Sequence, residues 1–190
     1  MNKAVFLDRD GTINIEKNYL YEIDKFEFIE GVPEAIKILN DKGYLVIVVT
    51  NQAGIGRGYY TEEDMHKLHK HIDKELEKYN AHIDAYYFCP HHPEHGIGKY
   101  RVDCECRKPR DGMLRKALED YNINAHNSYV IGDKVGDAYS GAGLGIKGII
   151  VESGHKLIEK DRTKFQVKRT LLEAVREDII KQRELKNVGH

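Results

Sequence analysis

The stretch KAVFLDRDGT, residues 3–12, decides the fold. Residues 3–7 form a short, nearly continuous apolar run that stops at Asp8, as expected of a strand buried on both faces. Similar runs occupy residues 44–49, 83–88, 129–131 and 148–151. Helical patterns lie between them, at residues 31–42, 61–79, 111–121 and 138–142. This alternation predicts the α/β class, with a Rossmann-like parallel sheet and helices on both faces.

Polar side chains stand where three of these strands end, at Asp8, at Thr50 with Asn51, and at Asp133. In a parallel sheet the carboxyl ends of the strands form one edge, and ligands bind beside that edge. Asp8 and Asp10 lie two residues apart, and two neighbouring carboxylates repel each other unless a cation lies between them. Mg²⁺ prefers oxygen ligands, so we predict a magnesium site here.

Composition limits the class of protein. The chain has 190 residues, of which 41% are hydrophobic and 32% charged, and its formal net charge is −1. This balance predicts one domain over residues 1–190 and gives no reason to expect nucleic acid or a membrane as partner. The apolar run at the start is too short for a signal peptide, so we expect a cytoplasmic protein.

The three cysteines lie close together in the sequence, at Cys89, Cys104 and Cys106. An odd number in so short a stretch is a poor disulfide framework. With a histidine from the pair His91 and His92, they offer three thiolates and one imidazole, a common ligand set for structural zinc. We therefore expect residues 89–108 to form a zinc-binding loop; the alternative is three small core cysteines.

Four motifs occur in order: DRDGT at residues 8–12, Thr50, CRKP at residues 106–109, and Gly132-Asp133. Together they resemble the haloacid dehalogenase superfamily of phosphatases. With the zinc loop they resemble the branch that holds heptose bisphosphate phosphatases and histidinol-phosphatase domains. The resemblance covers about residues 3–155 and implies the haloacid dehalogenase fold without a large cap.

The resemblance implies roles for individual residues. Asp8 is expected to be the nucleophile that becomes an aspartyl phosphate, and Asp10 the general acid and then base. Thr50 and Lys108 are expected to bind the transferring phosphate. Magnesium would be held by Asp8, Asp10 and Asp133, with Asp137 as an outer acid. Among the candidate zinc ligands, the family pattern favours His91 over His92, giving the set Cys89, His91, Cys104 and Cys106.

The expected substrate is a small phosphorylated sugar. The resemblance implies substrate contacts at Glu16, Lys17, Asn18, Tyr19, Thr50, Asn51, Gln52, Ala53, Arg107, Lys108 and Lys134. Arg107 is suited to a second anionic group because its planar fork matches phosphate. The glycine-rich residues 54–58 do not fit a P-loop and are expected to be a flexible turn.

We therefore expect hydrolysis of the 7-phosphate of a heptose 1,7-bisphosphate. The alternatives are histidinol-phosphate hydrolysis and a zinc-stabilised binding module without catalysis. We expect a monomer. An apolar stripe in the tail predicts a closing helix at about residues 170–184, although a helix that binds a partner has the same pattern.

Overall fold

The structure, a computed structural model, describes residues 1–189. Its centre is a six-stranded sheet in the order β3-β2-β1-β4-β5-β6. All five strand pairs are parallel. The strands are β1 (Ala4–Leu7), β2 (Leu45–Asn51), β3 (Ala85–Cys89), β4 (Tyr129–Gly132), β5 (Lys147–Val151) and β6 (Gln166–Lys168). The predicted parallel sheet is confirmed.

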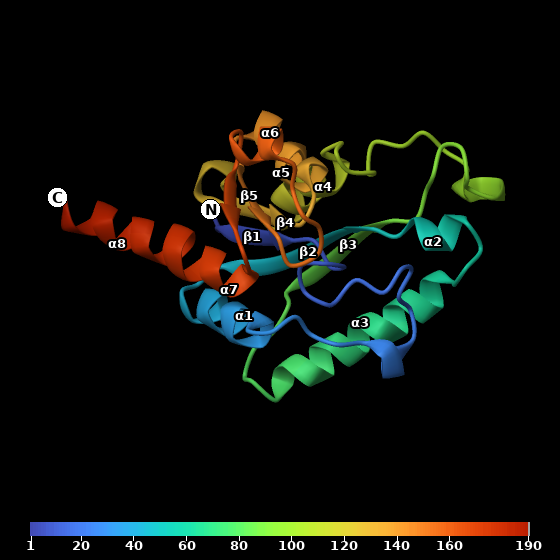
Figure 1. Cartoon of the computed structure of the whole chain (residues 1–190), viewed down its shortest axis with the longest axis horizontal. Helices are drawn as coiled ribbons and strands as arrows, with labels where there is room; N and C mark the ends of the chain where they lie inside the picture. The colour runs from blue at the N-terminus through green and yellow to red at the C-terminus, as the bar shows by residue number, and fades with distance from the viewer. Residues whose placement is uncertain (190) are drawn as a thin grey trace.

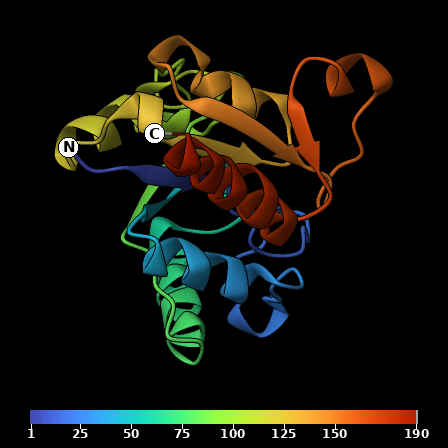
Figure 2. The ribbon, with the colours of Figure 1, turned by 90° about the vertical axis from the view of Figure 1, so that its left-hand side faces the viewer.

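Helices cover both faces of the sheet (Figures 1 and 2). The α-helices are α1 (Val32–Asp41), α2 (Ala53–Gly56), α3 (Glu62–Glu77), α4 (Gly112–Asp120), α5 (Val135–Ser140), α6 (Glu159–Arg162), α7 (Leu171–Ala174) and α8 (Lys181–Val188). Short 3-10 turns occur at Ile23–Lys25, Gly98–Tyr100, Ala125–Asn127 and Ala142–Leu144. In Figure 1, α1 and α3 lie below the sheet and α4, α5 and α6 above it.

The burial of β1 explains its apolar run. Val5 and Leu7 belong to the core on the face of α1 and α3, whereas Ala4 and Phe6 belong to the core on the face of α4. Successive side chains of a strand point to opposite faces, so a strand covered on both faces needs apolar residues at every position. The strand therefore places Asp8, the next residue, at the carboxyl edge of the sheet.

Helix α3 begins as the sequence predicts. The hydroxyl of Thr61 accepts a hydrogen bond from the amide of Asp64 at 3.1 Å, and the carboxylate of Asp64 accepts one from the amide of Thr61 at 3.0 Å. This reciprocal cap satisfies amides that the first helical turn leaves free. It fixes the point at which the chain turns back from the site along the face of the sheet.

Two expectations are corrected. The first part of the glycine-rich segment after β2 is helical and not a turn, because α2 covers Ala53–Gly56, and a Cβ at Gly54 would lie 2.3 Å from the Tyr60 ring. The tail helix does not end near residue 184: α7, a π-helical segment (Val175–Ile180) and α8 continue to Val188. Leu171, Val175 and Ile179 are buried against the core, so the helix closes the domain face as predicted.

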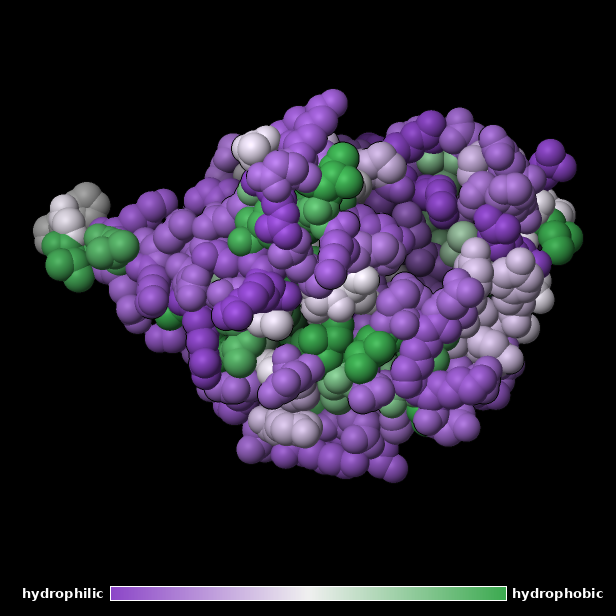
Figure 3. Space-filling model, viewed as in Figure 1, coloured by the Kyte–Doolittle hydropathy of each residue, from purple (hydrophilic) through white to green (hydrophobic). Residues whose placement is uncertain are grey.

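The surface in the view of Figure 3 is mostly hydrophilic, with apolar residues exposed in small groups. No helix within residues 1–189 is both long enough and apolar enough to cross a membrane. The prediction of one domain over residues 1–190 stays a prediction, and His190 lies outside the described residues.

Candidate active site

A cavity of about 340 Å³ opens at the carboxyl ends of β1, β2 and β4. Of the predicted substrate contacts, it is lined by Glu16, Asn18, Tyr19, Asn51, Gln52, Ala53, Arg107, Lys108 and Lys134. Two predicted contacts, Thr50 and Lys17, are not among the residues that line the cavity. Thr50 is buried near the end of β2, and its hydroxyl accepts a hydrogen bond from Gln52 at 2.9 Å. Lys17 is turned away and donates to the carbonyl of Lys25 at 2.6 Å.

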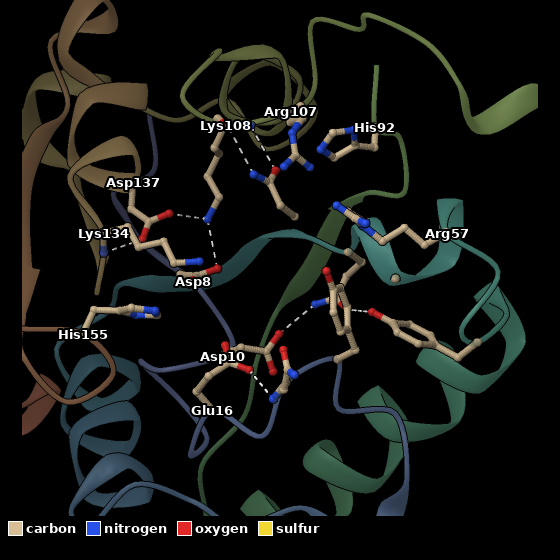
Figure 4. A pocket seen from close by; sticks show the side chains of 17 residues that line it. Asp8, Asp10, Glu16, Arg57, His92, Arg107, Lys108, Lys134, Asp137 and His155 are labelled. Carbon is tan, nitrogen blue, oxygen red and sulfur yellow. Dashed lines mark hydrogen bonds and ion pairs between the residues drawn. The ribbon is translucent and has the colours of Figure 1, made fainter. Parts of the chain in front are cut away.

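Lys108 joins two carboxylates at the floor of the cavity (Figure 4). Its Nζ lies 3.0 Å from Oδ1 of Asp8 and 2.7 Å from Oδ1 of Asp137. Burial alone would lower the pKa of Lys108, but Asp8 and Asp137 outweigh it and raise that pKa above its ordinary value. Lys108 therefore stays a cation beside Asp8, where it can offset the charge of an incoming phosphate.

Asp133 completes a group of three carboxylates. One oxygen from each of Asp8, Asp133 and Asp137 lies within 4.8 Å of the others. Asp133 is fully buried, and its Oδ1 has no hydrogen-bond partner among the described residues. Burial raises the pKa of Asp8 well above its ordinary value, and the neighbouring carboxylates add to the rise while Lys108 opposes it. This excess of negative charge fits a divalent cation bound by oxygen.

Two glycines make room for this group. A Cβ on Gly11 or on Gly154 would lie 2.3 Å from Oδ2 of Asp133. Gly11 also has a φ of +82°, which residues with a side chain rarely adopt. The glycine of the DRDGT motif is thus explained by the turn after Asp10 and by the close approach of Asp133.

The carboxylate of Asp10 is not part of the three-carboxylate group. It accepts hydrogen bonds from Arg9 at 3.1 Å, Asn14 at 3.0 Å and Gln52 at 3.0 Å. The chain has already left the strand here: the amide of Ile13 donates to the carbonyl of Arg9 at 2.8 Å. Residues two apart point the same way only on an extended chain, so this turn separates the direction of Asp10 from that of Asp8.

Arg9 is the residue that fixes Asp10. It is fully buried, its Nη2 also donates to the carbonyl of Leu20 at 2.9 Å, and its Nη1 lies 3.3 Å from Nε2 of His69. Burial would raise the pKa of Asp10, but Arg9 and the hydrogen bonds from Asn14 and Gln52 lower it. Asp10 is therefore a carboxylate in the free protein.

Asn51 ties the end of β2 to the loop that carries Lys108. Its side chain donates to the carbonyl of Lys108 at 3.1 Å and accepts from the amide of Lys108 at 3.0 Å. The ammonium of Lys108 also donates to the carbonyl of Val49 at 2.8 Å. Asn51 thus positions Lys108 as well as lining the cavity.

The four predicted zinc ligands meet in space. Sγ of Cys106 lies 3.0 Å from Sγ of Cys89 and 3.2 Å from Sγ of Cys104. Nδ1 of His91 lies 3.4 Å from Sγ of Cys106. All three thiols are free, and the four ligand atoms lie within 4.8 Å of one another. The donor set suits a closed tetrahedral zinc site.

A basic rim faces the carboxylates across the cavity. Figure 4 shows Arg57, His92 and Arg107 grouped on one side, with Lys134 and His155 on the opposite side. Nε of Arg57 is buried and has no hydrogen-bond partner in the described part of the chain. The rim therefore offers two guanidinium groups to a second anionic group on a ligand.

Sequence reasoning did not assign several residues of the site. Tyr60 donates to Oε1 of Gln52, and His155 contacts Asp133 through Nδ1. Arg9 is part of the DRDGT motif, but nothing in the sequence indicates that this charged residue after a strand is buried. His155 lies 22 positions from Asp133 in the sequence, and no local pattern connects them.

The comparisons with known proteins agree with this geometry. Residues 3–174 match the family model described as polynucleotide kinase 3 phosphatase. A relative from Haemophilus ducreyi is 46% identical over 164 residues, which cover 85% of this chain and 90% of that protein; it is named D-glycero-beta-D-manno-heptose-1,7-bisphosphate 7-phosphatase. A relative from Burkholderia mallei, 47% identical over 145 residues and covering 76% and 77%, is named for the alpha anomer.

The fold is shared with a solved structure. The D,D-heptose 1,7-bisphosphate phosphatase from B. bronchiseptica, complexed with magnesium and phosphate, has a TM-score of 0.81 to this chain at 24% identity. The alignment covers 97% of this chain and 99% of that one. The expected fold class is therefore confirmed.

Proposed function

The chain belongs to the polynucleotide kinase 3 phosphatase family, and on that premise we propose that it is a D-glycero-D-manno-heptose 1,7-bisphosphate 7-phosphatase. One observation carries the chemistry: Lys108 bridges Asp8 and Asp137 beside Asp133, at the floor of a cavity whose rim is basic. Relatives that are 44–47% identical to this chain are named for this activity. Their names favour heptose bisphosphate hydrolysis over histidinol-phosphate hydrolysis and over a binding module.

The reaction has two steps. In the first, a carboxylate oxygen of Asp8 attacks the phosphorus of the 7-phosphate, the bond to the sugar oxygen breaks, and an aspartyl phosphate forms. Asp10 gives its proton to the leaving oxygen. Although hydrogen bonds keep Asp10 ionised in the free protein, an incoming phosphate places negative charge nearby and so favours its protonated form.

In the second step, water attacks the phosphorus of the aspartyl phosphate. Asp10, now ionised, takes a proton from that water, and the carboxylate of Asp8 is released together with inorganic phosphate. Lys108 balances charge on the phosphoryl oxygens in both steps. The hydroxyl of Thr50 holds Gln52, which in turn holds Asp10.

Magnesium would be held by the carboxylates of Asp8 and Asp133, and it would supply charge neutralisation for the phosphoryl group. Asp137 is already paired with Lys108, and its Oδ2 accepts from the amide of Lys134 at 3.0 Å. It therefore acts by positioning Lys108. The carboxylate of Asp10 would transfer protons and would not bind the metal.

The 1-phosphate of the substrate would bind the basic rim. Arg57 and Arg107 lie across the cavity from Asp8, so a sugar phosphorylated at both ends can engage both groups at once. Glu16, Asn18 and Tyr19 would contact the sugar between them. The two named relatives differ in anomer, so both anomers belong in any test.

Zinc would have a structural role at Cys89, His91, Cys104 and Cys106. Arg107 and Lys108 follow Cys106 directly, so fixing Cys106 also fixes the two residues that face the phosphate groups. We further propose that the protein acts in the cytoplasm, because clustered thiols that are not paired as disulfides persist in a reducing compartment. A monomer stays our expectation.

The test is phosphate release with Mg²⁺, measured as kcat/KM for both anomers of the heptose 1,7-bisphosphate. Histidinol phosphate, fructose 1,6-bisphosphate and a 3′-phosphorylated oligonucleotide serve as comparison substrates. A heptose bisphosphate should be preferred over each comparison substrate by at least about tenfold. A preference for histidinol phosphate or for the oligonucleotide would refute the proposed substrate and keep the reaction type.

A further inference from the structure

Five cations gather at the end of the molecule opposite the candidate active site. They lie at or just before the amino ends of strands, or on the tail helix: Lys3, Lys42, Lys147, Arg183 and Lys186. In Figure 1, α8 leaves the body on the same side as the N-terminus, which marks the start of β1. The catalytic carboxylates follow the other ends of the same strands, so this cluster is a separate surface.

The cluster lines two adjoining cavities of about 360 and 140 Å³. Arg183 and Asn187, one helical turn apart on α8, line both of them. Lys147 and Lys186 line the larger cavity, and Lys3 and Lys42 line the smaller one. The volume of the larger cavity is in the range of small-molecule pockets.

Carboxylates do not balance these cations. Within residues 1–189, none of the five has a carboxylate oxygen within 4.0 Å. The cavities contain a single acid, Glu184. Three of the cations rest on aromatic rings instead: Lys3 lies 4.1 Å and Arg183 5.3 Å from the centre of Tyr44, and Lys147 lies 5.6 Å from that of Tyr129.

Tyr44 supplies an independent observation. Only 3% of the residue is exposed, yet its hydroxyl has no hydrogen-bond partner among the described residues. A buried hydroxyl without a partner is destabilising, so its presence at a cavity needs an explanation. Lys3 also indicates that positive charge is crowded here, because burial and the charges of Arg183 and Lys42 lower its pKa.

From this geometry we propose that the cluster is a binding site for a small molecule that carries phosphate groups, received by Arg183, Lys3 and Lys147 and by the hydroxyl of Tyr44. A phosphate group has two negative charges near neutral pH and three acceptor oxygens, which match several cations and one O–H donor. A nucleic acid is the less suitable occupant, because the cations line concave cavities and not an extended stripe.

The test is a titration of the ¹⁵N-labelled full-length protein with inorganic phosphate, followed by amide chemical shifts at constant ionic strength. The catalytic site will respond around Asp8 and Lys108. The proposal predicts a second set of shifts, with its own dissociation constant, at residues 42–45, 147 and 183–187. Shifts confined to the catalytic site would overturn the proposal.

Arg183→Gln and Lys181→Gln form a matched pair, because each removes one positive charge from α8 and only Arg183 lines the cavities. Arg183→Gln should raise the dissociation constant of the second set of shifts at least about tenfold, since a charge-assisted hydrogen bond is lost. The dissociation constant of the catalytic set should not change. Lys181→Gln should change neither. Equal weakening of phosphate binding by both variants would show that the cluster acts only through general surface charge, and would overturn the proposal.

Tyr44→Phe removes only the unpartnered hydroxyl. Without phosphate its melting temperature should equal or exceed that of the wild type, because no hydrogen bond is lost. With phosphate its stabilisation should be smaller than that of the wild type, because binding to the native state weakens. A lower melting temperature without phosphate would show that the hydroxyl already has a protein partner. Tight binding of a short single-stranded oligonucleotide at this surface, with no response to phosphate, would also overturn the proposal.

Discussion

Nη2 of Arg9 lies 3.1 Å from Oδ1 of Asp10, and the guanidinium that makes this contact is completely buried. The pair is adjacent in sequence, yet the two residues have different tasks. Arg9 reaches into the space between α3 and the segment around Leu20, while Asp10 faces the cavity with 18% of its side chain exposed. The position of the Asp10 carboxylate, which transfers the proton, therefore depends on how the core packs around Arg9.

Arg9→Met should destabilise the fold and impair catalysis together. Removing one partner from a buried ion pair leaves the other charge uncompensated, at about 3–5 kcal/mol. Chemical denaturation and kcat measure the two effects. Arg115→Met is the control, because Arg115 on α4 forms a surface pair with Asp111, the residue before that helix, which contributes about 0–1 kcal/mol. Equal effects of the two variants would contradict the role given to Arg9.

His69 should make the fold sensitive to acid. Burial, with the charge of Arg9, lowers its pKa from 6.5 to about 3, and its ring stacks on Tyr86. The unfolded chain binds a proton near pH 6.5 and the folded chain does not, so stability is lost as pH falls from about 6.5 towards 3. His69→Gln, which keeps an acceptor for Arg9, should lose less stability over this range. Denaturant midpoints at several pH values measure how steeply stability depends on pH. The same dependence in the wild type and in His69→Gln would show that His69 does not cause the acid sensitivity.

Cys104→Ser should lose zinc and most activity. The substitution removes one of four ligands, and the loop that carries Arg107 and Lys108 loses its anchor. Metal analysis of the purified protein, with kcat/KM, measures both. The control is His95→Asn, since His95 is outside the ligand group and half exposed. Full zinc content in Cys104→Ser would exclude Cys104 as a ligand.

Arg57→Gln should act on the second phosphate and not on the chemistry. For the heptose 1,7-bisphosphate, KM should rise about tenfold with little change in kcat, because one charge-assisted contact is lost. For the heptose 7-phosphate, which lacks the second phosphate, KM should hardly change. Arg101→Gln, an exposed residue of the neighbouring loop that does not line the cavity, is the matched control. An equal rise in KM for both substrates would remove Arg57 from the 1-phosphate site.

The sequence predicts the sheet well because its signals are local. Each central strand is covered on both faces, so β1 and β2 require apolar residues at consecutive positions, and such runs are visible without any structure. The zinc loop is equally visible, since ligand type and spacing are local. In both cases the signal and the structure involve the same few residues.

The remaining features depend on contacts between distant segments or on a change in backbone direction. The direction of Asp10 depends on the turn that contains Gly11, whose φ is +82° and against which Asp133 packs. The burial of Arg9 needs His69, which lies 60 positions away on α3. Lys17 lies within a segment predicted to touch substrate, but Lys25 and Glu27 fold back to bind it. No periodicity or motif in the sequence carries this information.

Asp8 is proposed to remove the 7-phosphate of a heptose 1,7-bisphosphate. ³¹P NMR of the reaction with Mg²⁺, comparing the wild type with Asp8→Asn, follows both phosphates of the substrate. We expect the wild type to release inorganic phosphate and leave only the anomeric 1-phosphate signal of the sugar, and Asp8→Asn to be at least about a thousandfold slower while still folded. Loss of the 1-phosphate signal in place of the 7-phosphate signal, or turnover by Asp8→Asn near the wild-type rate, would contradict it.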